Sequence, residues 1–177
     1  MRPVTSEPDF HAQFAQGPRF AREVRVSRDI EAPQRLVWET LIRFDEYPKW
    51  NPFTTRVVGT PEVGAPVELH VNMPGRPRVV QREWVNLVEA PHRICWGLHM
   101  LGSSMLTTNR FQVLEPISET RTRYTTWDAF SGWMVPLVFA IYGAPMARGF
   151  DLMAEALRVH CESLARQASA TEVSKPS

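Results

Sequence analysis

The feature that most constrains the fold is a run of short strand-like segments between residues 54 and 130. Apolar and polar side chains alternate along these segments, which is the pattern of strands with one buried face. Turn-forming residues at 61–64, 74–77 and 116–119 separate them. Strands joined by connections this short cannot be parallel, so the sequence predicts an antiparallel sheet. The expected strands are 54–58, 66–73, 78–88, 93–99, 105–114 and 121–130.

A strand and a helix are predicted before this region. In AREVRVSRDI (21–30), alternation places Val24, Val26 and Ile30 on one side of a further strand, the seventh of the sheet. Pro33 then suits the first position of a helix whose apolar stripe continues to Phe44. Pro48 disfavours helical geometry in the residue before it, so this helix should not pass Tyr47. A second short helix is expected within FDEYPKWNPF (44–53).

The last predicted element is a long helix. Met146, Phe150, Met153 and Leu157 recur at three- and four-residue steps, and charged residues occupy the other faces. A kink or break at 143–145, where a glycine and a proline occur, should precede the main helix. We therefore expect one domain at 21–166, an N-terminal arm at 1–20 and a polar, frayed tail at 167–177.

The composition excludes several classes of function. The formal net charge is +1, from 20 basic and 19 acidic residues, with no run of lysine or arginine. Neither a nucleic-acid partner nor a polybasic membrane segment is therefore predicted. Metal-ligand spacings, phosphate-binding glycine loops and the GxSxG motif are absent, so we expect no metal and no cofactor. The longest apolar stretch is too short to span a bilayer, and the N-terminus lacks the pattern of a signal peptide. We expect no integral membrane association and a cytoplasmic location, as a monomer or a homodimer.

The order of elements is that of the helix-grip fold, an α+β architecture in which a curved sheet holds a C-terminal helix. IEAPQRLVWETLIRFDEYPKWNPF (30–53) resembles the opening of polyketide cyclase/dehydrase-like proteins of the START/Bet v 1-like SRPBCC superfamily, whose pattern is APxxxVWxxLxxFxxYPxWNPF. RFQVLEP (110–116), TRTRYTTWDAFSG (120–132) and GFDLMAEALRVHCESL (149–164) resemble later blocks. The resemblance covers about residues 22–166. It implies a seven-stranded sheet, two short helices after the first strand, and an internal cavity.

Strand alternation selects candidates for the wall of that cavity. Taking Phe111 as inward-facing brings Asn109 with it, and taking Phe130 as inward-facing brings alternate residues of its own strand. The final helix supplies the remaining wall, although its apolar positions are also what an ordinary core requires. The candidate ligand-binding residues are Phe53, Trp96, Asn109, Phe111, Tyr124, Thr126, Asp128, Phe130, Met146, Phe150, Met153 and Leu157.

Asp128 is the first catalytic candidate, and Tyr124 is the second. The resembling proteins usually have glutamate at the position of Asp128. A carboxylate inside an apolar pocket has a raised pKa and can act as a general base or accept a hydrogen bond from a ligand. The alternative is a structural carboxylate paired with a nearby arginine or hydroxyl group.

Three functions remain open from the sequence. The first is a protein that binds a small lipid-, aromatic- or polyketide-like ligand in the cavity. The second is a cyclase or dehydratase in which Asp128 or Tyr124 moves a proton. The third is a protein-binding module with a filled cavity and an exposed apolar patch.

Overall fold

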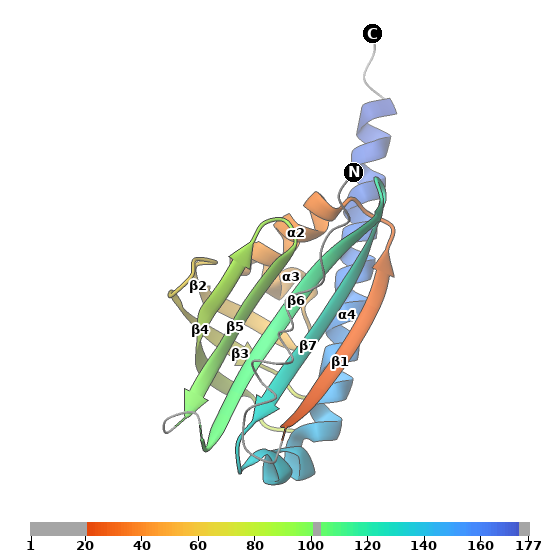
Figure 1. Cartoon of the computed structure of the whole chain (residues 1–177). Helices are drawn as coiled ribbons and strands as arrows, with labels where there is room; N and C mark the ends of the chain where they lie inside the picture. Colours follow the sequence, from red (N-terminus) through yellow and green to blue (C-terminus); the bar gives the residue numbers. More distant parts are fainter. Residues whose placement is uncertain (1–20, 101–103, 174–177) are drawn as a thin grey trace.

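The computed structural model describes residues 21–100 and 104–173. It confirms the predicted fold, a seven-stranded antiparallel sheet with a long C-terminal helix and two short helices after the first strand (Figure 1). The elements in chain order are β1 (Ala21–Ile30), α2 (Gln34–Ile42), η1 (Phe44–Glu46), α3 (Tyr47–Trp50), β2 (Thr54–Gly59), β3 (Pro66–Val71), β4 (Val79–Glu89), β5 (Arg93–Met100), β6 (Leu106–Ser118), β7 (Arg121–Ser131) and α4 (Val135–Val173). The predicted arm at 1–20 lies outside the described residues.

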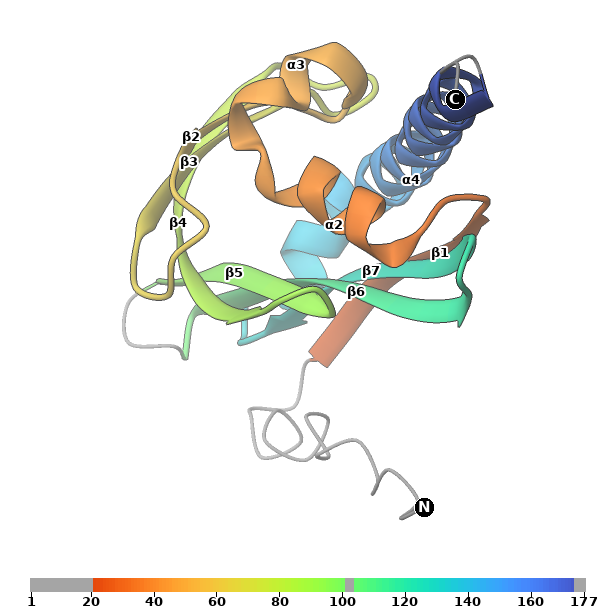
Figure 2. The same ribbon diagram turned by 90° about the horizontal axis from the view of Figure 1, so that it is seen from above.

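Strands β2 to β7 form a meander in which each strand pairs with the next, and β1 pairs with β7 at one edge of the sheet. Its strand order is β1-β7-β6-β5-β4-β3-β2, so the two edge strands, β1 and β2, are consecutive in the chain. The helices α2 and α3 therefore cross from one edge of the sheet to the other. Figure 2 shows the sheet curling around α2 and α4, which lie on its concave side.

The aromatic segment after α2 is buried. The Tyr47 ring lies 5.8 Å from that of Phe44 and 4.9 Å from that of Trp50, measured between centroids. The Tyr47 hydroxyl donates to the Leu41 carbonyl at 2.9 Å. The Asn51 side-chain oxygen accepts from the backbone N–H groups of Phe53 and Thr54, at 3.0 and 2.8 Å. This turn ends α3 and fixes Phe53 where β2 begins.

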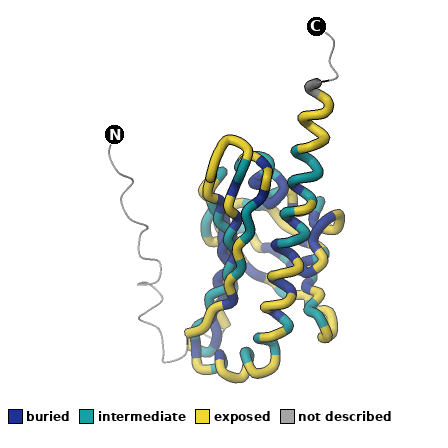
Figure 3. Tube along the Cα trace, turned by 90° about the vertical axis from the view of Figure 1, so that its right-hand side faces the viewer, coloured by how far each residue is buried: buried dark blue, intermediate teal, exposed yellow. Residues whose placement is uncertain are grey.

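Helix α4 is continuous from Val135 to Val173 with Pro145 inside it. Its first turns run in a different direction from the rest (Figure 1), in agreement with the predicted kink at 143–145. The predicted frayed tail is wrong for its first part, because the helix continues seven residues past Arg166. That extension contains no proline or glycine, and its exposed surface lies beyond the body of the protein (Figure 3).

Candidate functional site

A pocket of about 490 Å³ lies between the concave side of the sheet and α4. Most of its lining is apolar, and strands β3 to β7, the first half of α4 and Phe53 all contribute to it. A pocket of this size and character is typical of sites for small organic ligands. The lining residues are Phe53, Leu69, Val71, Met73, Val79, Gln81, Glu83, Leu98, Met100, Leu106, Thr108, Arg110, Asp128, Phe130, Val138, Tyr142, Met146 and Phe150.

The charged lining residues are Glu83, Arg110 and Asp128. Arg110 on β6 and Asp128 on β7 are directly opposite each other in the register of the two strands, so their side chains share a face. Glu83 comes from β4, and its Oε1 accepts a hydrogen bond from Gln81 Nε2 at 2.6 Å. Glu83 and Arg110 are only 3% and 5% exposed. The pocket therefore has one polar wall within an apolar lining.

Burial changes the acid–base properties of both carboxyl groups. Desolvation raises the pKa of Glu83 to about 8, and the nearby charge of Asp128 contributes to the shift. Desolvation also raises the pKa of Asp128 to about 7, while the charge of Arg110 opposes this rise. A carboxyl pKa raised towards neutral pH favours general acid–base catalysis.

Arg110 is held by aromatic rings and a sulfur atom. Its Nη2 donates to Met153 Sδ at 2.7 Å, and its guanidinium carbon lies 4.2 Å from the Phe150 ring centroid and 5.5 Å from that of Phe53. No carboxylate oxygen of a described residue lies within 4 Å of its nitrogens. Three buried polar atoms of this wall have no hydrogen-bond partner among the described residues: Glu83 Oε2, Arg110 Nε and Asp128 Oδ1.

The other half of the concave side is filled by side chains. Tyr124 is fully buried, and its hydroxyl donates to Gln112 Oε1 at 2.8 Å. Trp96 packs edge-to-face against Phe44, with ring centroids 5.9 Å apart. Thr126 donates to the Phe111 carbonyl at 2.9 Å. These residues lie on the predicted face of the sheet but outside the pocket lining.

The prediction that Phe111 faces the cavity is wrong. Phe111 stacks on Trp127 with ring centroids 4.9 Å apart, and the Arg25 guanidinium lies 4.1 Å from the Trp127 ring centroid on the opposite face of the sheet from Arg110. Asn109 shares that outer face, where its Oδ1 accepts from Asn86 Nδ2 at 3.0 Å. The physical reason is that β6 is buried on both faces from Leu106 to Gln112, so an aromatic residue does not identify its inner face.

Five of the candidate ligand-binding residues line the pocket: Phe53, Asp128, Phe130, Met146 and Phe150. Met153 and Leu157 lie further along α4 in the filled half, where both are buried. The sequence interpretation missed Glu83 and Arg110. Arg110 would have been selected if the alternation on β6 had been read in the opposite phase. Glu83 lies between two exposed residues, Arg82 and Trp84. Because Trp84 is apolar but lies on the outer face, the alternation of apolar and polar residues on β4 did not mark Glu83 as inward-facing.

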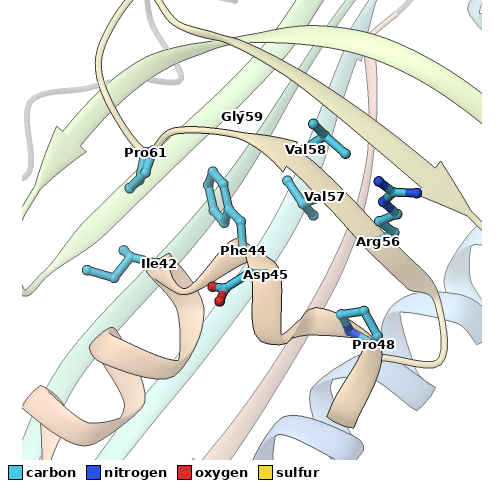
Figure 4. Close-up of a pocket in the computed structure, with 9 residues that line it drawn as sticks. All are labelled: Ile42, Phe44, Asp45, Pro48, Arg56, Val57, Val58, Gly59 and Pro61. Atoms are coloured by element: carbon cyan, nitrogen blue, oxygen red, sulfur yellow. The ribbon is translucent and has the colours of Figure 1, made fainter.

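A second pocket, of about 510 Å³, lies between η1, α3 and β2 (Figure 4). Its lining includes Phe44 and Asp45 from η1, Pro48 from α3, and Arg56 and Val57 from β2, as Figure 4 shows. The carboxyl group in its lining, that of Asp45, is exposed. The pocket between the sheet and α4 is therefore the better candidate site.

The described residues contain neither a candidate metal-binding cluster nor a candidate membrane-spanning helix. Residues 21–100 and 104–173 contain no group of three or more His, Cys, Asp or Glu side chains that could hold a metal ion. Within the same ranges, no helix is long and apolar enough to cross a membrane.

A family model and a known plant protein match this sequence. The family model described as "Polyketide cyclase / dehydrase and lipid transport" matches residues 21–162. The abscisic acid receptor PYL7 of Arabidopsis thaliana is 32% identical over 87 residues, which are 48% of this chain and 40% of that receptor. The match thus spans less than half of the receptor.

Solved structures share the fold at low sequence identity. The Zhui aromatase/cyclase of a Streptomyces species has a TM-score of 0.66 at 20% identity, covering 81% of this chain and 94% of that one. A START superfamily protein of Mycobacterium smegmatis has a TM-score of 0.62 at 17% identity, covering 80% and 98%. Norcoclaurine synthase of Thalictrum flavum has a TM-score of 0.59 at 15% identity, covering 78% and 85%.

Proposed function

Because the chain belongs to the polyketide cyclase/dehydrase and lipid transport family, we propose that it binds a small hydrophobic ligand in the pocket between the sheet and α4. The ligand is lipid-, aromatic- or polyketide-like. The observation that carries the proposal is an apolar pocket of about 490 Å³ with one polar wall. Burial of apolar ligand surface supplies the affinity, at roughly 25 cal/mol per Å² before the costs of association are subtracted.

The polar wall orients the ligand. Glu83, Arg110 and Asp128 together provide acceptors and a donor whose hydrogen-bonding capacity is not used by the described residues. A ligand hydroxyl or carbonyl group near Arg110 would use this capacity, provided that small side-chain movements expose the buried atoms. The remaining carbon skeleton would extend along Leu69, Val71 and Phe130. We therefore expect an apolar ligand that carries oxygen at one end.

A pair of neighbouring substitutions tests the binding site. Val79 lines the pocket, whereas Val80 is 58% exposed on the other face of β4. We expect Val79→Trp to fill part of the pocket and to weaken binding of Nile red, an uncharged fluorescent probe, while Val80→Trp leaves binding unchanged. Equal binding by both variants, or no binding by the natural chain, contradicts the proposal. Native mass spectrometry of gently purified protein would identify a retained ligand.

An enzyme of the cyclase or dehydratase type is the second candidate. The observation that favours it is the presence of two carboxyl groups with raised pKa values, Glu83 and Asp128, beside a buried guanidinium. In such an enzyme Asp128 would take a proton from the substrate, and Arg110 would stabilise the negative charge that develops on a carbonyl oxygen. Tyr124 is a weaker candidate because its buried hydroxyl is already bonded to Gln112.

The two candidates differ in their response to Asp128→Asn. The amide keeps the shape of the side chain but cannot act as a base at neutral pH. If the protein is an enzyme, the variant binds a linear β-polyketone with unchanged affinity and no longer cyclises it. If the natural chain binds the compound and does not convert it, the binding function stands alone. A protein-binding module with a filled cavity is disfavoured by the pocket itself.

A further inference from the structure

The end of the molecule at which α4 begins has an exposed apolar surface. Trp133 and Leu137 are 61% and 56% exposed, and Ile141 is 37% exposed. Leu137 and Ile141 are four positions apart on the first turns of α4 and so lie on one side of it, and Trp133 is in the turn just before the helix. Met100, at the end of β5, is 41% exposed. Trp133, Leu137, Ile141 and Met100 are called the apolar tip below.

The apolar tip adjoins the candidate ligand site. On the same turns of α4, Val138 and Tyr142 line the pocket. Met100 belongs to both, because it lines the pocket and is also exposed to solvent. In Figure 1, the end of β5, the start of β1 and the first turns of α4 all lie at the lower end of the sheet. The pocket lining therefore reaches the surface at this tip.

Arginines that form no ion pair within the described residues lie on the elements at this end of the molecule. Arg76 donates to the Ile141 carbonyl at 2.5 Å, and its guanidinium carbon lies 5.6 Å from the Tyr142 ring centroid. Arg22 lies near the start of β1, Arg78 just before β4, and Arg148 further along α4; all are exposed. Among the residues that the structure describes, none of these four arginines forms an ion pair, whereas Arg28, Arg121 and Arg123 elsewhere on the molecule do.

Three of the segments at this end carry no acidic residue: residues 72–80, 98–100 together with 104–106, and 131–149 contain Arg76, Arg78 and Arg148 but neither aspartate nor glutamate. At the start of β1, beside Arg22, the acidic residue is Glu23, which pairs with Arg25. The arginines are scattered along the sequence, so no basic run announces them, and the fold brings them to one end. A basic rim around exposed tryptophan and leucine is typical of surfaces that lie in the interface of an anionic membrane.

We propose that the apolar tip, with Arg22, Arg76, Arg78 and Arg148 around it, docks on an anionic lipid surface. Trp133, Leu137 and Ile141 enter the boundary between headgroups and acyl chains, and the arginines contact the lipid phosphates. Docking in this orientation brings the exposed edge of the pocket lining at Met100 against the bilayer. An apolar ligand could then pass between the membrane and the pocket with little exposure to water.

Vesicle co-sedimentation tests this proposal with the full chain. We expect the protein to sediment with vesicles of phosphatidylcholine and phosphatidylserine, and far less with vesicles of phosphatidylcholine alone. An arginine near an anionic leaflet contributes about five-fold to partitioning. The double variant Arg78→Gln/Arg148→Gln should therefore bind the anionic vesicles about 25-fold more weakly. Trp133→Ser/Leu137→Ser should weaken binding by at least about ten-fold.

Matched controls are available on other surfaces. Arg166→Gln removes an exposed arginine near the far end of α4, and Val63→Ser removes an apolar side chain that is 65% exposed. Neither should change sedimentation. The proposal is overturned if the natural chain does not bind anionic vesicles or if the controls lose as much binding as the tip variants. It is also overturned if Trp133→Ser/Leu137→Ser converts a dimer to a monomer without affecting vesicles, because a second copy then covers the tip.

The result of the vesicle experiment can be distinguished from the result of the probe-binding experiment that tests the pocket. Nile red binding in the absence of vesicles reports on the pocket, and Arg78→Gln/Arg148→Gln should leave it unchanged. Loss of vesicle binding with intact probe binding therefore concerns docking alone.

Discussion

At the residue scale, the dominant feature is an arginine buried without a carboxylate in contact. The guanidinium of Arg110 carries a positive charge, which must be balanced within the interior. The nearby groups that can supply a negative charge are Asp128 and Glu83, whose pKa values are raised to about 7 and about 8. At neutral pH the two carboxyl groups are therefore only partly ionised. The wall carries little negative charge, which suits an uncharged polar group of a ligand.

The raised pKa values predict a decrease in stability with rising pH. In the unfolded chain both carboxyl groups lose their protons near their ordinary values of 3.8 and 4.5. Between there and about pH 8, the folded state binds more protons than the unfolded state, so the free energy of unfolding falls as pH rises. We expect this fall between about pH 4 and about pH 8 in urea unfolding followed by circular dichroism, and a shallower slope for Glu83→Gln. A flat or rising profile for the natural chain would contradict the assignment.

Tyr124 and Asp128 should respond differently to conservative substitution. Tyr124→Phe removes the hydrogen bond to Gln112 inside the filled half of the core, which should cost about 1–3 kcal/mol in the free energy of unfolding. Nile red affinity should stay the same because Tyr124 does not line the pocket. Asp128→Asn should change the pH dependence of probe binding. A large loss of probe affinity in folded Tyr124→Phe would show that the ligand reaches the filled half.

Among the charged residues that line the pocket, the sequence singled out Asp128 but not Glu83 or Arg110. Asp128 stood out because it shares a face with Phe130 and lies in a recognisable block of the chain. Glu83 and Arg110 had no such signal, since charged residues on strands ordinarily face water. Their role depends on strands β4, β6 and β7 curving towards one another, and that relation is set by the tertiary structure.

At the scale of elements, the contact between α4 and Phe53, just before β2, depends on a glycine. A Cβ atom at Gly149 would lie 2.1 Å from Cδ2 of Phe53, so the ring fits against the helix because no side chain is present there. At Gly143 the nearest atom to such a Cβ would be Phe139 Cδ1, at 3.3 Å, which needs only a small adjustment. The same helix therefore contains one glycine required by packing and one that is not.

These two glycines give opposite predictions. Gly149→Ala should push the Phe53 ring out of its place, reduce Nile red binding and lower the free energy of unfolding by about 1–3 kcal/mol. Gly143→Ala should be neutral or stabilise by up to about 1 kcal/mol, because alanine is the better helix former. Urea unfolding and probe titration of the two variants measure both effects. Equal destabilisation by the two would show that helix bending, not the ring, requires glycine.

At the scale of the whole molecule, alternation and short turns were sufficient to predict the sheet, and the apolar stripe was sufficient to predict the last helix. The position of the pocket was harder, because the concave side is divided into a filled half and an open half. Trp96, Tyr124 and Thr126 face the correct side but lie in the filled half. The division depends on where Phe44 and Tyr47 insert, and strand periodicity carries no information on that.

The C-terminal part of α4 should be dispensable for folding. Residues 167–171 are exposed and lie beyond the sheet (Figure 3). We expect a chain that ends at Arg166 to keep the free energy of unfolding within about 0.5 kcal/mol of the full chain and to bind Nile red equally. A much larger loss in urea unfolding would show that the domain extends past 166.

The strand order gives the segment between β1 and β2 a further consequence. Its ends are attached to the two outermost strands, so its contour length sets how far apart those strands can lie. Residues 31–53 therefore act as a spacer that joins the two edges of the sheet across the space inside it. Insertions or deletions in this spacer should alter which ligand sizes are accepted while every strand of the sheet keeps its own sequence.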